Sequence, residues 1–173
     1  SRSLTYMEKL QDAKGIESSL GNLGSVYFYQ GSLEKAEESY QRALQIMVEA
    51  NDPLGQGIYN EYLGNTSLKK EELDQAISYY EKAKEFMTLA KQDERKIQQL
   101  EGRIDSLHKH PAILGKNESA LLAEVESLTS SGQKTQVVAK LQDLEELYFQ
   151  WKRMDKVAET ILKTIAVLED MGD

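Results

Sequence analysis

A pattern of leucine, glycine, alanine and tyrosine recurs forty residues further along this 173-residue chain. Leu23-Gly24 falls on Leu63-Gly64, and the matches continue at Leu33/Leu73, Ala36/Ala76, Tyr40/Tyr80 and Ala43/Ala83. Coincidences of several residue types at one offset indicate a repeated structural unit. One such unit cannot bury its apolar face alone, so neighbouring units must stack. This requirement restricts the chain to a repeat architecture.

A further copy of the pattern occupies the end of the chain, and a degenerate copy lies between. The positions of Leu20, Leu23, Tyr27, Leu33, Ala36 and Tyr40 recur as Leu141, Leu144, Tyr148, Met154, Val157 and Ile161. In the degenerate copy Ile104 takes the key leucine position. Segment 109–117 is interpreted as an inserted loop, because Pro111 stops a helix and Asn117 or Ser119 can cap the next one.

The chain is therefore predicted to be a single array over residues 1–173. Residues 1–13 are the tail of a preceding repeat, followed by repeats at 14–53 and 54–92, a degenerate repeat at 93–133 and a repeat at 134–173. Apolar residues recur in three- and four-residue steps, which predicts helices near 14–30, 33–49, 54–70, 73–91, 94–108, 118–130, 134–152 and 154–170.

Gly24 and Gly64 stand inside predicted helices, where glycine costs about 1 kcal/mol relative to alanine. We expect each glycine to let the first helix of its pair approach the second, at Ala36 and Ala76 respectively.

The motif Leu-Gly-x-x-Tyr, followed by Gly-x-x-x-x-Ala-x-x-x-Tyr-x-x-Ala-Leu, resembles the signature of the tetratricopeptide repeat. The first unit fits it at Leu23, Gly24, Tyr27, Gly31, Ala36, Tyr40, Ala43 and Leu44, and the second at Leu63, Gly64, Ala76, Tyr80 and Ala83. Forty residues exceed the usual repeat length of about 34. This spacing resembles the "NLGN"-type repeats of polarity adaptors and of bacterial regulatory proteins. The resemblance implies an all-α fold, a right-handed α-solenoid of antiparallel helix pairs.

Composition argues against several classes of function. The chain has no cysteine, a net charge of −8 and a pI of about 4.9, which disfavours nucleic acid as a partner. No apolar run reaches the length of a membrane span. Only His108 and His110 offer imidazoles, and no phosphate-binding glycine loop is present. We therefore expect a cytoplasmic protein that is not an enzyme and carries no cofactor and no metal.

The resemblance also implies a concave groove lined by the first helix of each pair, at positions one before and two, five and six after the key leucine. We expect a peptide-binding site formed by Asn22, Ser25, Phe28, Tyr29, Tyr62, Asn65, Lys69, Arg103 and Phe149. The other inward positions of the last unit are Asp143, Glu146 and Gln150. A chaperone-type carboxylate clamp is not expected, since its lysine positions hold Gly21 and Ser18, or Glu61 and Ile58.

The sequence thus predicts a non-catalytic scaffold or adaptor that binds a peptide segment of a protein partner. Net acidity favours a basic or neutral partner through electrostatic steering. One alternative is a regulatory or sensor domain of a larger, bacterial signalling or transcription protein. Another is a self-assembling solenoid, a homo-oligomer joined through uncapped ends.

Overall fold

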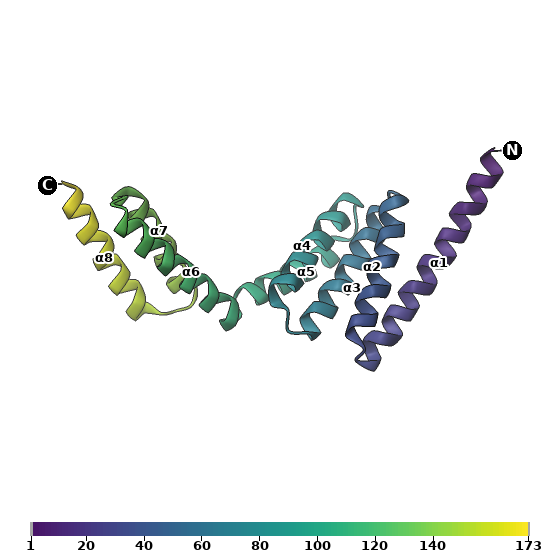
Figure 1. Ribbon diagram of the computed structural model, residues 1–173, viewed down its shortest axis with the longest axis horizontal. Helices are drawn as coiled ribbons and strands as arrows, with labels where there is room; N and C mark the ends of the chain where they lie inside the picture. Colours follow the sequence, from purple (N-terminus) through teal and green to yellow (C-terminus); the bar gives the residue numbers. More distant parts are fainter. Residues whose placement is uncertain (1, 173) are drawn as a thin grey trace. The chain divides into compact units, whose positions relative to one another are not determined.

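In a computed structural model, residues 2–172 are described, together with the side chains of residues 12–172. This part of the chain forms helices and no strand: α1 (Arg2–Gln30), α2 (Leu33–Glu49), α3 (Pro53–Lys69), α4 (Leu73–Leu89), α5 (Glu94–His108), α6 (Pro111–Ser130), α7 (Lys134–Gln150) and α8 (Met154–Gly172) (Figure 1). The predicted all-α fold is confirmed.

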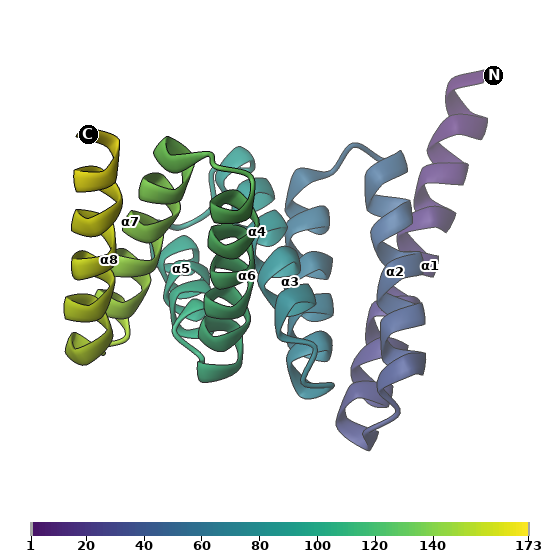
Figure 2. The ribbon, with the colours of Figure 1, turned by 60° about the vertical axis from the view of Figure 1, so that its left-hand side comes forward.

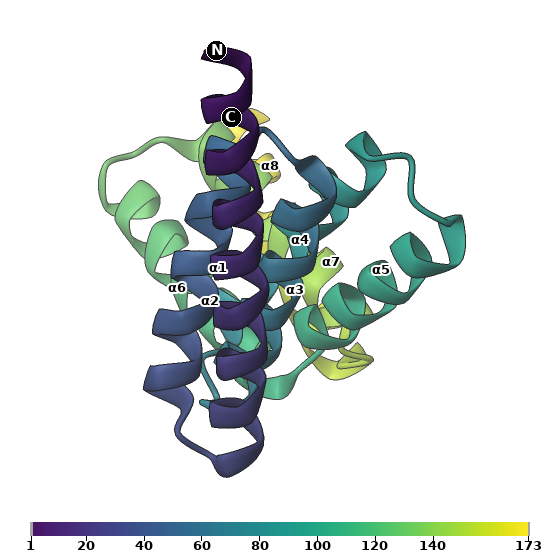
Figure 3. The ribbon, with the colours of Figure 1, turned by 90° about the vertical axis from the view of Figure 1, so that its right-hand side faces the viewer.

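The helices divide into two compact units, residues 1–107 and 108–173. In unit 1, α1 packs on α2, α2 on α3 and α3 on α4 (Figure 3). In unit 2, α6 packs on α7 and α7 on α8 (Figure 2). Each unit is thus built from consecutive antiparallel helices, as the repeat pattern predicts. The single array over 1–173, with its repeat boundaries, stays a prediction.

Two helices begin earlier than the sequence pattern predicts. The first runs without a break from Arg2, because neither proline nor glycine interrupts residues 2–14. The side chains of residues 1–11 lie outside the described part, so the assignment of 1–13 to a preceding repeat stays a prediction.

The inserted loop predicted at 109–117 is wrong. Helix α6 begins at Pro111, so only Lys109 and His110 connect it to α5. Proline fits the first position of a helix, where its missing N–H needs no partner. Asn117 and Ser119 do not cap the helix. His110 does, because its Nδ1 accepts the backbone N–H of Ala112 at 3.3 Å.

The turns between helices repeat one backbone conformation. A residue with positive φ follows each helix from α1 to α4, and also α6 and α7. After α1, α3 and α7 these residues are Gly31, Glu71 and Lys152. After α2, α4 and α6 they are Asn51, Lys91 and Gly132. Four of these six residues are not glycine. The two-residue link between α5 and α6 has no positive φ, so the break between the units coincides with the one turn of the described chain that departs from the repeat.

Gly24 and Gly64 leave no room for a side chain between the paired helices of unit 1. A Cβ atom on Gly24 would lie 2.6 Å from the ring of Tyr40, and one on Gly64 would lie 2.7 Å from the ring of Tyr80. The close approach expected at these glycines is therefore present. The group that fills the space is the tyrosine of the second helix, where the sequence pattern suggested the alanine.

The core of unit 1 runs along both repeats, whereas equivalent positions in α1 and α3 differ in burial. Leu63 is 1% exposed, but Leu23 is 42% exposed, because no described helix covers that face of α1. In unit 2 the core is formed by α7, packed against apolar residues of α6 and α8: Val137, Leu141, Leu144 and Tyr148, with Leu121, Val125, Leu128, Val157 and Val167.

Candidate functional site

A small depression in unit 1 gathers side chains from α1, α2 and α3. It has a volume of about 150 Å³ and is lined by Ser25, Phe28, Tyr29, Tyr40, Tyr62 and Asn65. We call it the aromatic depression. Five of its lining residues are among the nine predicted from the sequence, so the repeat positions do converge. The sixth, Tyr40, belongs to the repeat signature and is not among the nine predicted site residues.

Tyr40 forms the buried wall of the aromatic depression. Its ring centroid lies 5.1 Å from that of Tyr62 and 6.4 Å from that of Tyr59. On α1, the rings of Phe28 and Tyr29 meet edge to face at 5.6 Å, and Tyr29 is 83% exposed. Burial raises the pKa of the Tyr40 hydroxyl, although its hydrogen bond to Ser25 acts in the opposite direction. Buried and exposed rings side by side suit an apolar side chain.

Two core tyrosines hold the polar residues of this surface at equivalent repeat positions. The Tyr40 hydroxyl donates to Ser25 Oγ at 3.2 Å, and the Tyr80 hydroxyl donates to Asn65 Oδ1 at 2.8 Å. Ser25 in turn donates its only hydroxyl hydrogen to the carbonyl of Gly21 at 3.0 Å. Ser25 is therefore satisfied within the protein, which weakens its predicted role as a peptide-binding residue.

Three cations of α3 and α5 are linked to this surface, Lys69 through Phe28, Arg103 through Asn65 and Lys96 through Glu61, and are here called the cationic rim. The Lys69 ammonium lies 4.6 Å from the centroid of the Phe28 ring and donates to the Phe28 carbonyl at 3.0 Å. Arg103 donates to Asn65 Oδ1 at 2.9 Å. Both Lys96 and Arg103 contact the buried carboxylate of Glu61, at 2.9 and 3.4 Å.

Sequence reasoning named Lys69 and Arg103 but missed the partners that hold them. Glu61 was considered only as a failed clamp position, and Lys96 has no counterpart in the repeat signature. A buried carboxylate needs cationic partners, so a glutamate at a core-facing position was the signal that could have pointed to Lys96.

The other two predicted residues lie apart from the aromatic depression. Asn22 is exposed on α1, and its side chain makes no hydrogen bond to another described residue. Phe149 is 65% exposed on α7 and belongs to unit 2. It does not line the depression of about 420 Å³ in that unit, which is formed by Asn117, Ala120, Leu121, Asp143, Glu146, Leu147 and Gln150.

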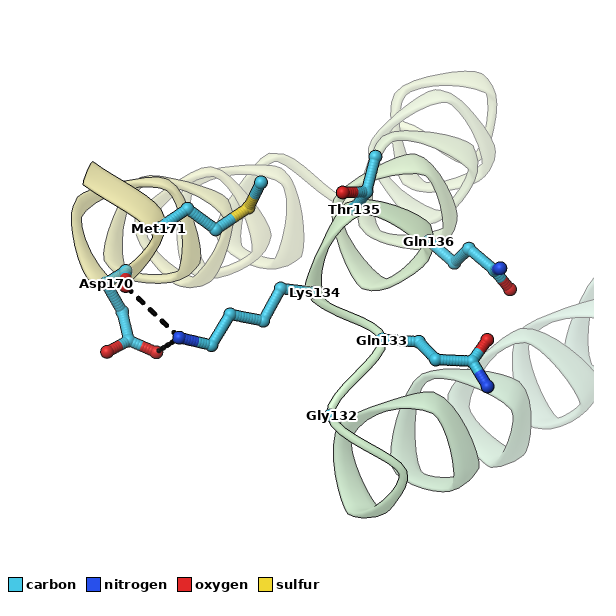
Figure 4. Close-up of a pocket in the computed structure, with 7 residues that line it drawn as sticks. All are labelled: Gly132, Gln133, Lys134, Thr135, Gln136, Asp170 and Met171. Atoms are coloured by element: carbon cyan, nitrogen blue, oxygen red, sulfur yellow. Dashed lines mark hydrogen bonds and ion pairs between the residues drawn. The ribbon is translucent and has the colours of Figure 1, made fainter. Parts of the chain in front are cut away.

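Larger depressions offer less chemistry for recognition. One, of about 430 Å³, lies between the turn before α7 and the end of α8 (Figure 4). Its cation is already engaged, since Lys134 contacts the carboxylate of Asp170 at 2.6 Å and its carbonyl at 3.1 Å. Gln133 and Gln136 point away from this pair. Another, of about 550 Å³, follows the exposed face of α1 along Asp12, Gly15, Ile16, Ser19, Leu20 and Leu23.

The described residues contain no group of three histidine or acidic side chains placed to hold a metal ion. His108 ends α5 and His110 caps α6, so both imidazoles stand at the link between two helices. Within residues 2–172, no helix is long and apolar enough to cross a membrane.

Comparison with known families agrees with the geometry of unit 1. The family model described as Tetratricopeptide repeat matches residues 15–88, which begin in α1 and end in α4. A comparison with curated proteins gave no match. The matched region contains both Gly–Tyr contacts and all six residues of the aromatic depression. Residues 15–88 therefore match the tetratricopeptide repeat family, as the sequence motif predicts.

Proposed function

We propose that this protein is a non-catalytic scaffold or adaptor that binds an extended segment of a protein partner across α1, α3 and α5. Tetratricopeptide repeats generally mediate protein–protein interactions, and the proposal extends this role to a particular surface. The observation that carries it is the aromatic depression, where exposed Tyr29 stands beside the buried ring of Tyr40. Aromatic anchors next to small pockets supply most of the binding energy in protein interfaces.

The role of each predicted residue follows from its surroundings. Phe28, Tyr29 and Tyr62 would contact an apolar side chain, and Asn65, Lys69 and Arg103 would hold polar groups of the partner. Asn22, with no hydrogen bond to another described residue, is available to pair with the partner's backbone. Ser25 cannot donate to the partner, because its only hydroxyl hydrogen is bonded to the carbonyl of Gly21.

Peptide display against the whole chain, followed by fluorescence anisotropy with the selected peptides, tests this proposal. Tyr29→Ala should weaken binding by tenfold or more, since this side chain is exposed and supports no core contact. Leu89→Ala, at another well-exposed apolar position, on α4, is the control and should bind normally. Peptides that bind both variants as tightly as the unchanged chain would place the binding surface elsewhere. Phe149→Ala shows in the same assay whether unit 2 contributes.

Exposed apolar faces favour a second candidate function, head-to-tail assembly. On α8, Ile161 and Leu168 occupy the repeat positions of Tyr40 and Met47, which are buried between α2 and α3. Yet both residues are more than 40% exposed, as is Leu23 on α1. As a second candidate, α8 of one copy would pack on α1 of another, a heterologous contact that propagates into filaments.

Light scattering at increasing concentration tests the assembly. Leu23→Glu and Leu168→Glu should each abolish it, and a mixture of the two variants should stop at dimers. A monomer mass at every concentration would contradict this candidate.

A further inference from the structure

Around the aromatic depression, hydrogen bonds within the protein use the oxygen of Asn65 but leave N–H groups available to a partner. Two side chains donate to Oδ1 of Asn65: the Tyr80 hydroxyl at 2.8 Å and Arg103 at 2.9 Å. An amide oxygen has two lone pairs, so this oxygen is filled. The side-chain NH₂ of Asn65 has no hydrogen bond to another described residue and is the group it can offer.

The cationic rim adds further donors. Arg103 carries five N–H groups, of which only those of one terminal nitrogen contact Asn65 and Glu61. Lys69 uses one of its three donors on the carbonyl of Phe28. Both side chains also lie beside aromatic rings, Lys69 by Phe28 and Arg103 by Tyr80 at 5.6 Å, which holds them in place.

The charge of this surface is opposite to that of the chain. Of the three cations of the rim, Lys96 and Arg103 share the carboxylate of the buried Glu61, whereas Lys69 makes no ion pair with a described residue. The remaining positive charge lies next to the aromatic depression, although the whole chain carries −8. Net charge steers diffusion over long distances, but the groups in contact decide which segment is retained.

We propose that the partner segment presents a carboxylate beside an apolar or aromatic side chain. The apolar side chain enters the aromatic depression, and an aspartate or glutamate of the segment accepts from Arg103, Lys69 and the Asn65 NH₂. This inference rests on the proposed function. It replaces the basic or neutral partner expected from net charge. It also differs from the chaperone-type clamp, because the lysine positions of that clamp hold Gly21 and Ser18, or Glu61 and Ile58.

A random peptide library displayed on phage, selected against the whole chain at low ionic strength, tests the inference. Selected peptides that lose binding to Tyr29→Ala and are enriched in aspartate or glutamate next to an apolar residue would support it. Enrichment in lysine, arginine or uncharged residues among peptides that need Tyr29 would overturn it and leave the proposed function standing. Selected peptides that bind Tyr29→Ala as tightly as the unchanged chain would overturn both the inference and the proposed function.

Charge variants at two positions sharpen the result. Arg103→Gln should weaken a selected acidic peptide by about tenfold, the size of one hydrogen bond to a charged group. Asn65→Asp keeps the oxygen that Tyr80 and Arg103 use, but replaces the NH₂ with negative charge. It should weaken an acidic peptide by more than tenfold and would strengthen a basic one. Lys84→Gln, which removes an ion-pairing lysine of α4, is the matched control.

Circular dichroism of each variant verifies that helicity is kept. Binding to Asn65→Asp that equals or exceeds binding to the unchanged chain would contradict the proposal.

Discussion

The two units use different residue types at the same repeat positions, where the paired helices meet. In unit 1, Gly24 in α1 faces the ring of Tyr40 in α2. The corresponding residues of unit 2 are Glu145 and Ile161. There Glu145 accepts a hydrogen bond from Thr164 at 2.8 Å, and Ile161 is 42% exposed. A glycine–tyrosine contact thus brings the paired helices together in unit 1, and a polar contact joins them in unit 2.

This difference between the units shows that helices can pair without the glycine–tyrosine motif of the repeat signature. The family match ends at residue 88, within unit 1, where both glycine–tyrosine contacts lie. Unit 2 keeps the helix lengths and the positive-φ turns but not the contact. Helix pairing therefore tolerates the loss of the motif, because an amphipathic pattern alone still buries one face of each helix.

The largest expected effect separates the two kinds of contact directly. Gly24→Leu should destabilise unit 1 by about 3 kcal/mol or more, since the new side chain would overlap the Tyr40 ring. Glu145→Leu, at the same repeat position, should change unit 2 by about 1 kcal/mol or less, because Thr164 keeps its bond to the carbonyl of Thr160.

Urea unfolding followed by two probes measures both effects. Trp151 is the only tryptophan, so its fluorescence reports on unit 2, and circular dichroism reports on all helices. Equal losses in the two variants would remove the distinction between the contacts.

Alkaline pH is expected to act more strongly on unit 1 than on unit 2. Burial raises the pKa of Tyr40, Tyr59 and Tyr80 in unit 1, and a hydrogen bond to Glu17 raises that of Tyr59 further. In unit 2, burial and the hydrogen bond to Glu118 raise the pKa of Tyr148 to about 12. A raised folded-state pKa stabilises the fold below the ordinary value of 10, and this stability is lost as pH rises above it.

Between pH 10 and 12 the urea midpoint should therefore fall further by circular dichroism than by Trp151 fluorescence. The raised pKa values of Lys70 and Lys140 affect one unit each and do not reverse the order. Tyr148→Phe should flatten the pH dependence of the Trp151 signal and leave that of unit 1 unchanged. The opposite order of midpoints would contradict the assignment.

The fold could be predicted because apolar residues and turn residues recur at regular intervals along the sequence. Helix boundaries follow from apolar spacing and turn residues, and most agree with the structure to within two residues. The start of α6 could not be placed, because proline both ends and begins helices, and only the neighbouring geometry decides. The histidine cap of α6 has no sequence signal as strong as that of serine or asparagine.

The candidate site was predictable only in part, for a related physical reason. Repeat positions place Ser25, Phe28, Tyr29, Tyr62 and Asn65 around one depression. They do not show which polar groups are already satisfied, because that depends on contacts between helices. The Ser25 hydroxyl already donates to the Gly21 carbonyl and accepts from Tyr40. By contrast, Asn65 accepts from Tyr80 through its oxygen, so its NH₂ can still donate. Tertiary hydrogen bonds therefore decide which predicted residues remain available.

The smallest expected effect concerns a backbone conformation that both units share. Glu71 and Lys152 adopt φ values of 62° and 56° at the turn where Gly31 adopts 80°. A side chain in this region costs roughly 1–2 kcal/mol, and glycine avoids that cost. Glycine also gains up to about 1 kcal/mol of entropy in the unfolded chain, so most of the benefit is offset. Glu71→Gly and Lys152→Gly should each stabilise their own unit by about 0.5 kcal/mol.

The two probes of urea unfolding distinguish these effects. Lys152→Gly should shift the transition seen by Trp151 fluorescence. Glu71→Gly should shift only the transition seen by circular dichroism. Gly31→Ala is the reverse change and should lower stability by about 0.5 kcal/mol. The turn is the feature that survives in unit 2 after the glycine–tyrosine contact has gone. Similar shifts in both units would therefore identify the backbone turn, more than the motif, as the element that every repeat of this chain requires. A gain in unit 1 alone would mean that the turn of unit 2 relaxes without strain.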